Sequence, residues 1–159
     1  MNPVALVATI KINLLRRPLW HPSTVEECLD IFRPRLDSML EDGSLPWAFD
    51  LGVGRYRKEP RILAHCVVER VMGPIPAIGE TRNLRLPEVV NLILPQQRET
   101  LRAVELQRWF HAKPDLIRDL GCAGEIKKVK EQLAKQGPKA SPRFTRESVV
   151  KLLEKRRIA

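Results

Sequence analysis

The sequence predicts a mixed α+β fold, mostly helical, in which one plan of helix, turn, helix, β-hairpin and closing helix occurs twice. Two stretches show the same succession of helical and strand-like periodicity. A glycine precedes the first hairpin strand of each, and a Pro-Arg-apolar triplet, at 60–62 and 142–144, precedes each closing helix. We therefore expect an N-terminal module over 1–72, a linker over 73–98 and a C-terminal module over 99–159.

The N-terminal module opens with an alternating segment, 6–12, that favours a strand. A first helix is expected over 23–32 and a second around 36–40, ending before Gly43. Strands over 45–51 and 57–62 then form a hairpin around a glycine-rich turn, and a helix over 64–71 closes the module.

The linker begins with a Gly- and Pro-rich stretch and continues into a short apolar helix over 87–94, bracketed by Pro87 and Pro95. Because this helix is too apolar for a free spacer, we expect it to pack on one module, or to contact a second copy of the chain or a partner protein.

The C-terminal module begins with a helix over 100–110, for which Thr100 is the expected N-cap. Pro114 starts a second helix that ends near Gly121 or Gly124. Strands over 125–130 and 141–144 form the hairpin, and Thr145 caps the closing helix. The residues expected to face inward are Leu116, Ile117 and Leu120 of the second helix and Val149, Val150, Leu152 and Leu153 of the last.

The charge of the chain points to an acidic partner such as nucleic acid, an anionic membrane surface or an acidic protein, because the net charge is +9. Residues 99–159 contain 15 Lys/Arg and 8 Asp/Glu (+7), whereas residues 1–98 contain 13 and 11 (+2). No segment is long and apolar enough to span a bilayer, so no membrane partner is expected. Three well-separated cysteines do not suggest a disulfide framework, and a cytoplasmic location is expected.

The C-terminal module resembles the winged helix-turn-helix of the excisionase and MerR type. The residues that carry the resemblance are Glu105-Leu106, Phe110, Ile117, Leu120, Gly124-Glu125-Ile126, Arg143-Phe144 and Lys155-Arg156-Arg157. The N-terminal module resembles the same family through Glu26-Glu27, Phe32, Leu36, Leu40, Gly43-Ser44-Leu45-Pro46 and Arg61-Ile62. Phe32 and Gly43 are 11 residues apart, against 14 for Phe110 and Gly124 (43 − 32 and 124 − 110), which predicts a shortened, degenerate N-terminal copy.

The resemblance implies two tandem winged helix-turn-helix modules that bind double-stranded DNA sequence-specifically and without catalysis. The protein would then be a transcriptional regulator or an excisionase-like recombination factor. The alternative is a protein-interaction or assembly module, for example a phage DNA-packaging recognition subunit, that uses the winged fold to dock on a partner.

The candidate DNA-binding residues are basic side chains of the second helices and the hairpins, since arginine pairs with guanine or phosphate and lysine with phosphate. Arg118 is the first choice for a base contact; its alternative is a surface ion pair with Asp115 or Asp119. In the C-terminal module the candidates are Lys113, Arg118, Lys127, Lys128, Lys130, Lys135, Lys139 and Arg143. In the N-terminal module they are Arg55, Arg57, Lys58 and Arg61.

Catalytic and metal-binding patterns are weak, so we predict no enzyme, no metal and no cofactor. His21, His65 and His111 are far apart in the sequence, and no phosphate-binding glycine motif occurs. Cys28 and Cys66 with His65 could ligate a metal, but buried apolar cysteines are the preferred interpretation. Trp20, Trp47 and Trp109 are expected in the core.

Overall fold

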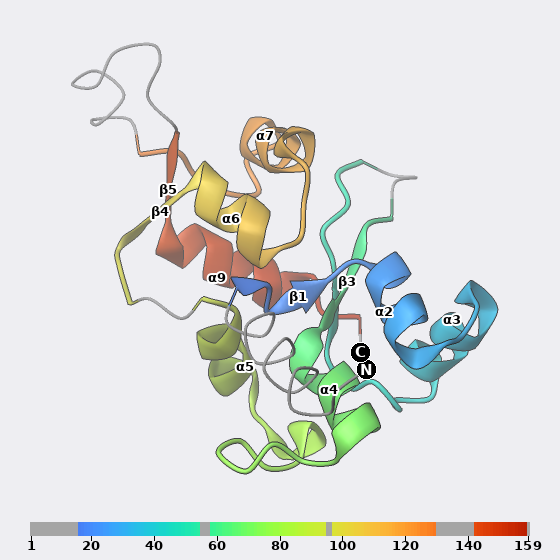
Figure 1. Ribbon diagram of the computed structural model, residues 1–159. Coiled ribbons are helices and arrows are strands. Elements are labelled where there is room, and N and C mark those ends of the chain that lie inside the picture. The colour runs from blue at the N-terminus through green and yellow to red at the C-terminus, as the bar shows by residue number, and fades with distance from the viewer. Residues whose placement is uncertain (1–15, 55–57, 95–96, 130–141, 159) are drawn as a thin grey trace.

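The computed structural model describes residues 16–54, 58–94, 97–129 and 142–158. Within these ranges the fold is α+β, with short helices and two small antiparallel sheets (Figure 1). No helix of the described ranges is long and apolar enough to cross a membrane.

The first half of the chain folds around a three-stranded sheet of order β1-β3-β2. Its elements are β1 (Leu19–Trp20), α2 (Pro22–Leu29), α3 (Arg33–Glu41), β2 (Ala48–Asp50), β3 (Pro60–Leu63) and α4 (Ala64–Met72). Helix α2 begins with a proline at its first position, where no backbone donor is needed, and His21 caps it by accepting a hydrogen bond from the Ser23 amide. We call residues 19–72 the N-terminal repeat.

The second half repeats this order around a two-stranded sheet. Its elements are β4 (Thr100–Arg102), α6 (Ala103–Trp109), α7 (Pro114–Cys122), β5 (Arg143–Thr145) and α9 (Arg146–Lys155). Lys128 forms an isolated antiparallel bridge with Phe144, at the position that β2 holds beside β3. We call residues 100–155 the C-terminal repeat.

The two repeats have helix pairs of equal spacing, so the predicted shortening of the N-terminal copy is wrong. Helices α3 and α7 each have nine residues, and Arg33 precedes Pro114 by 81 residues, as Leu19 precedes Thr100. The error lay in matching Phe32 with Phe110. Phe32 is 87% exposed just before α3 and corresponds to Lys113, whereas Phe110 is fully buried.

Two further differences from the prediction occur at β4 and β1, strands too short to show the alternation of buried and exposed residues that identifies a strand in a sequence. Thr100 does not cap α6; it pairs with Thr145 in the β4–β5 ladder, and Arg102 is the N-cap residue. Strand β1 was not predicted at all. Thr145 does cap the closing helix, accepting a hydrogen bond from the Ser148 amide, as predicted. The strand expected over 6–12 lies outside the described residues.

The core is one continuous hydrophobic cluster that joins both repeats. Trp20, Trp47 and Trp109 belong to it, as predicted. Of the two cysteines expected to be buried, Cys66 is buried but Cys28 is exposed, because Val25 rather than Cys28 marks the inward face of α2.

The linker packs within the chain. Its short 3₁₀ turn η1 (Thr81–Asn83) accepts a hydrogen bond from the Trp47 indole at the Thr81 carbonyl (2.7 Å), and helix α5 (Leu86–Ile93) packs on α9. Val89, Val90 and Ile93 are buried. The predicted 87–94 helix therefore packs on the C-terminal repeat of the same chain, the first of the alternatives expected for it, while Leu86 and Leu92 are only partly buried.

The end of the chain ties the C-terminal repeat to the N-terminal sheet. The Asp50 amide donates to the Arg156 carbonyl (2.8 Å) and the Ile158 amide to the Ala48 carbonyl (2.9 Å), so residues 156–158 run along the outer edge of β2. The Arg157 guanidinium lies 3.7 Å from the Trp47 ring centroid, a cation–π contact. The two repeats are thus held together by backbone and side-chain contacts at β2.

Candidate nucleic-acid interface

Helix α7 is fixed by its apolar face and presents charged side chains on the other. Leu116, Ile117 and Leu120 are buried, as predicted. Spacings of one, three and four residues put these three on one side of the helix. Lys113 and Arg118 are exposed on the outer side.

Arg118 and Lys128 meet at one shallow depression of about 280 Å³, whose floor includes Pro114 and Phe144. Lys128 and Phe144 form an antiparallel bridge, and both side chains lie against Gly121 of α7. Arg118 also lies 3.4 Å from Asp115 and 3.9 Å from Asp119, the ion pair considered as its alternative role. Because its side chain is 66% exposed, these contacts hold Arg118 at the surface without removing it from solvent.

Only some of the other candidate residues of the hairpins lie within the described ranges. The Lys127 backbone is held between the Ser148 hydroxyl and the Thr145 amide, both at 2.9 Å, while its side chain is exposed. Arg143 is half-buried on β5, and Lys58 is exposed. Lys130, Lys135, Lys139, Arg55 and Arg57 lie outside the described residues.

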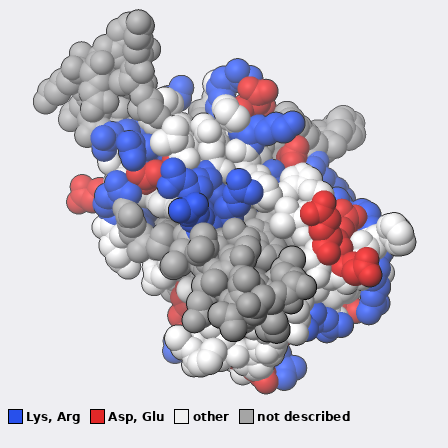
Figure 2. Space-filling view, in the orientation of Figure 1, with Lys and Arg blue, Asp and Glu red and all other residues white. Residues whose placement is uncertain are grey.

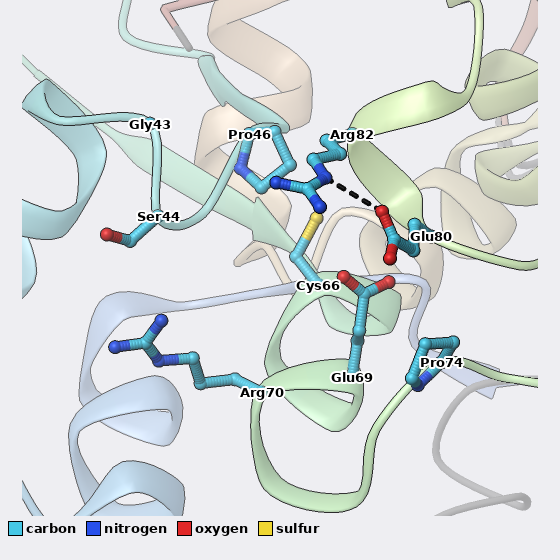
Figure 3. A pocket seen from close by; sticks show the side chains of 9 residues that line it. All are labelled: Gly43, Ser44, Pro46, Cys66, Glu69, Arg70, Pro74, Glu80 and Arg82. Carbon is cyan, nitrogen blue, oxygen red and sulfur yellow. Dashed lines mark hydrogen bonds and ion pairs between the residues drawn. The ribbon is translucent and has the colours of Figure 1, made fainter.

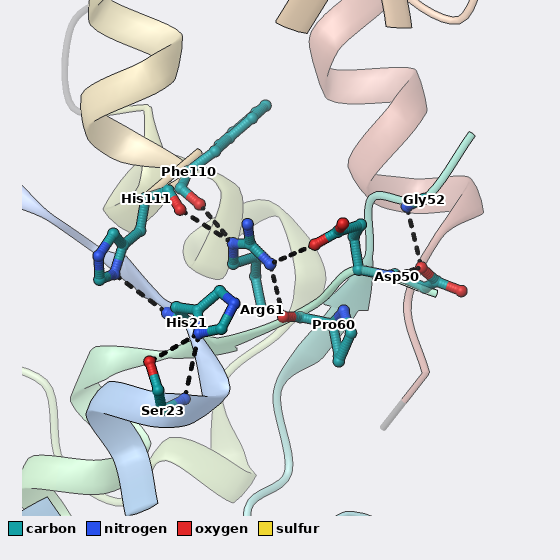
Figure 4. Close-up of polar contacts among 9 residues, drawn as sticks. His21, Ser23, Asp50, Gly52, Pro60, Arg61, Phe110 and His111 are labelled. Atoms are coloured by element: carbon teal, nitrogen blue, oxygen red, sulfur yellow. Dashed lines mark hydrogen bonds and ion pairs between the residues drawn. The ribbon is translucent and has the colours of Figure 1, made fainter. Parts of the chain in front are cut away.

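Arg61 is not a surface residue, which corrects its inclusion among the DNA contacts. It is 3% exposed. Its Nε donates to the carbonyls of Phe110 (2.9 Å) and His111 (3.2 Å), at the end of α6 in the other repeat. A guanidinium that is buried and occupied by these carbonyls cannot reach a phosphate; it joins the repeats (Figure 4).

Arginines that were not among the candidates add positive charge to the surface of the C-terminal repeat around β4 and α6. Arg98 and Arg102 both pair with the buried Glu105, at 3.0 and 3.1 Å, and Arg108 is exposed one turn further along α6. Figure 2 shows basic side chains gathered over α6 and β4. The basic excess of residues 99–159 signalled this surface, but only the fold shows that α6 contributes to it.

The N-terminal helix pair is acidic, whereas the C-terminal helix pair is neutral. Residues 22–42 contain six carboxylates and two arginines, for a net charge of −4, whereas the equivalent residues 103–123 contain three acidic and three basic side chains. An acidic group is visible over α2 in Figure 2. Because carboxylates repel phosphate, the two helix pairs differ in their suitability for DNA.

A separate cleft of about 410 Å³ lies beside Cys66 and is lined by Glu69, Arg70, Glu80 and Arg82 (Figure 3). Burial raises the pKa of the Cys66 thiol to about 11. The thiol is therefore protonated at neutral pH and is a poor nucleophile and a poor metal ligand.

Comparisons with protein-family models, with curated proteins and with solved structures find no match to this chain.

Proposed function

We propose that the protein binds double-stranded DNA without catalysis, and that the C-terminal repeat is a winged helix-turn-helix whose second helix, α7, enters the major groove. The observation that supports this most directly is the joint exposure of Arg118 and Lys128 at one surface between α7 and the hairpin. In such modules the second helix reads base edges and the basic hairpin holds the backbone.

The N-terminal repeat then has a different task from the C-terminal one. Its helix pair corresponds in order and length to α6 and α7 but carries a net charge of −4, so it is poorly suited to DNA. In this proposal it supports the C-terminal repeat through Arg61 and the edge of β2. Regulation of transcription and excisionase-like recombination both require this kind of binding.

The test is a titration of duplex DNA at several salt concentrations, read by fluorescence anisotropy. Neutralising a phosphate contact lowers the slope of log affinity against log salt by about 1, so Lys128→Ala should reduce both affinity and slope. Arg118→Ala should lower affinity for a selected site by roughly 10- to 100-fold if it contacts a base, and reduce the preference for that site.

Two matched variants control for loss of charge alone. Arg82→Ala removes an exposed arginine paired with Glu80, and Lys151→Ala removes an exposed lysine paired with Glu147. Neither lies at the α7–hairpin surface, and neither should change DNA affinity by more than the general loss of one positive charge. Equal effects of all four substitutions, or no duplex binding at low salt, would rule out the proposed surface.

A second candidate function, docking on a partner protein, is favoured by one observation. Phe32 is 87% exposed at the start of α3, three residues after the end of the acidic helix α2. An exposed aromatic side chain is typical of a protein contact. If a partner is captured and Phe32→Ala abolishes the capture while DNA affinity is unchanged, the N-terminal repeat is a docking module.

A further inference from the structure

A cleft of about 670 Å³ lies between the two repeats and adjoins the Arg118–Lys128 surface, with which it shares Gln107 and Asp115. Arg17, His21 and Arg61 line it from the N-terminal side, and Arg108, His111 and Lys113 from the C-terminal side. Glu59 and Asp115 also line it, and each has a cationic partner, Arg61 at 3.3 Å and Arg118 at 3.4 Å. Four cationic side chains against two carboxylates give the lining a net charge of +2 with both histidines neutral.

The hydrogen bonds around His111 contain one donor too many. The His21 amide lies 3.1 Å from Nδ1 of His111, and an Arg17 guanidinium nitrogen lies 3.3 Å from Nε2. Both neighbours are donors, but a neutral imidazole has only one acceptor nitrogen. Whichever nitrogen carries the proton, two N–H groups must face each other.

Of the two donors, we expect the partly buried His21 amide to be the one that is paired with the acceptor nitrogen of His111. An unpaired buried amide costs free energy, whereas the Arg17 side chain can turn to solvent. His111 is then the Nε2–H tautomer, and its Nε2–H and the Arg17 guanidinium are neighbouring donors with no acceptor between them among the described residues. His21 has the same tautomer, because its own Nδ1 accepts from the Ser23 amide at 3.1 Å.

The ring of His111 is also held in place. Its residue has a left-handed backbone (φ 49°), and its carbonyl accepts a hydrogen bond from Arg61. His21 and His111 are edge-on, with ring centroids 6.1 Å apart (Figure 4). The Nε2–H donor of His111 is therefore positioned by contacts between the repeats, and Arg17 is the exposed, adjustable donor beside it.

We propose that this cleft binds a phosphate-type oxyanion, with one oxygen accepting hydrogen bonds from Arg17 and from Nε2–H of His111. Arg108 and Lys113 add positive charge at the same cleft. The phosphate is either a free small ion or part of a DNA backbone; the donor chemistry is the same. The inference does not depend on α7 binding DNA, because its donors lie outside the Arg118–Lys128 surface.

Histidine-detected ¹⁵N NMR on the full chain, with inorganic phosphate titrated at constant ionic strength, tests the proposal. We expect a saturable shift of the His111 Nε2 signal with the Nε2–H tautomer retained. Burial and the charges of Arg17, Arg61 and His21 lower the pKa of His111 to about 4, so a bound anion should raise this pKa.

Two substitutions are expected to weaken phosphate binding. Arg17→Gln removes one charge-assisted donor from an exposed side chain and should weaken phosphate binding about tenfold or more. His111→Asn removes the Nε2–H donor and retains a residue type that tolerates the left-handed backbone, so it should lose the site but keep the fold. Arg85→Gln, an exposed arginine on the N-terminal side of α5 that does not line the cleft, should bind phosphate as the unchanged protein does.

The source of the phosphate follows from a second titration with duplex DNA. A saturable response to phosphate that duplex does not displace identifies a small ion; a response to duplex that Arg17→Gln weakens identifies the DNA backbone. Signals at His111 that do not respond saturably to either, or that respond equally in Arg17→Gln, would overturn the inference. Duplex affinity that Arg118→Ala and Lys128→Ala leave unchanged would instead count against the proposed function and would leave the phosphate site untouched.

Discussion

Replacing Arg61 should weaken the contact between the two repeats, because this buried side chain makes several of the hydrogen bonds that join them. Its guanidinium donates to the carbonyls of Phe110, His111 and Pro60 at 2.9, 3.2 and 3.0 Å and pairs with Glu59 at 3.3 Å. Arg61→Ala leaves two carbonyls of the other repeat without this donor. Breaking a buried charge network of this kind costs about 3–5 kcal/mol.

The measurement is the free energy of unfolding from urea titration, together with the thermal midpoint. For a chain of this size, a loss of 3–5 kcal/mol corresponds to a fall in Tm of roughly 6–20 °C. Arg61→Lys should give an intermediate loss, since an ammonium keeps the charge but lacks the planar fork that reaches several acceptors.

The matched control is Arg143→Ala, because Arg143 stands at the equivalent position of the other Pro-Arg-apolar triplet. Within the described residues, no side-chain hydrogen bond or ion pair joins Arg143 to the N-terminal repeat. Its replacement should therefore change stability by no more than about 1 kcal/mol. Equal losses for Arg61→Ala and Arg143→Ala would refute the assignment of Arg61 as the connection between the repeats.

Three further outcomes follow from the same contacts. Burial lowers the pKa of His65 from 6.5 to about 4, so stability should fall as the pH drops through this range, by about 3 kcal/mol at most, and His65→Leu should flatten the fall in a pH series of urea titrations. Deletion of residues 156–159 removes the backbone pairing with β2, so hydrogen exchange at the Asp50 amide should accelerate while α7 amides stay protected. Glu105→Gln weakens the pairing with Arg98 and Arg102 and should cost about 1–3 kcal/mol in the same urea assay; no loss would mean that the arginines are held by other contacts.

The parts of the fold that were predicted correctly depend on short-range spacing. The inward positions Leu116, Ile117 and Leu120, the cap at Thr145 and the apolar residues of α9 follow from contacts within one or two helical turns. Arg118 and Lys128 were predicted as surface residues for the same reason, since the buried face of each element determines which side chains remain outside.

The errors have a different cause, which is contact between distant segments. Strands of two or three residues, β1 and β4, exist because β3 and β5 pair with them, and no periodicity can be read from so few residues. Phe32 was matched with Phe110 by residue type, although one is exposed and the other buried. Arg61 was predicted at the DNA because it ends a basic hairpin; its burial depends on carbonyls 49 and 50 residues away.

The equal length of the two helix pairs changes how the duplication is to be understood. A truncated N-terminal copy would lack part of the helix that a winged helix-turn-helix places in DNA. Instead, α3 matches α7 in length, and each is followed by a glycine with positive φ, Gly43 and Gly124. The difference lies in the side chains: Arg61 faces the other repeat where Arg143 does not, and Phe32 stands where Lys113 stands. One backbone plan thus supports an acidic helix pair, with a net charge of −4 over 22–42, and a neutral one over 103–123. Exchanging the exposed charged residues of these two segments, without changing the core, should move duplex affinity from one repeat to the other.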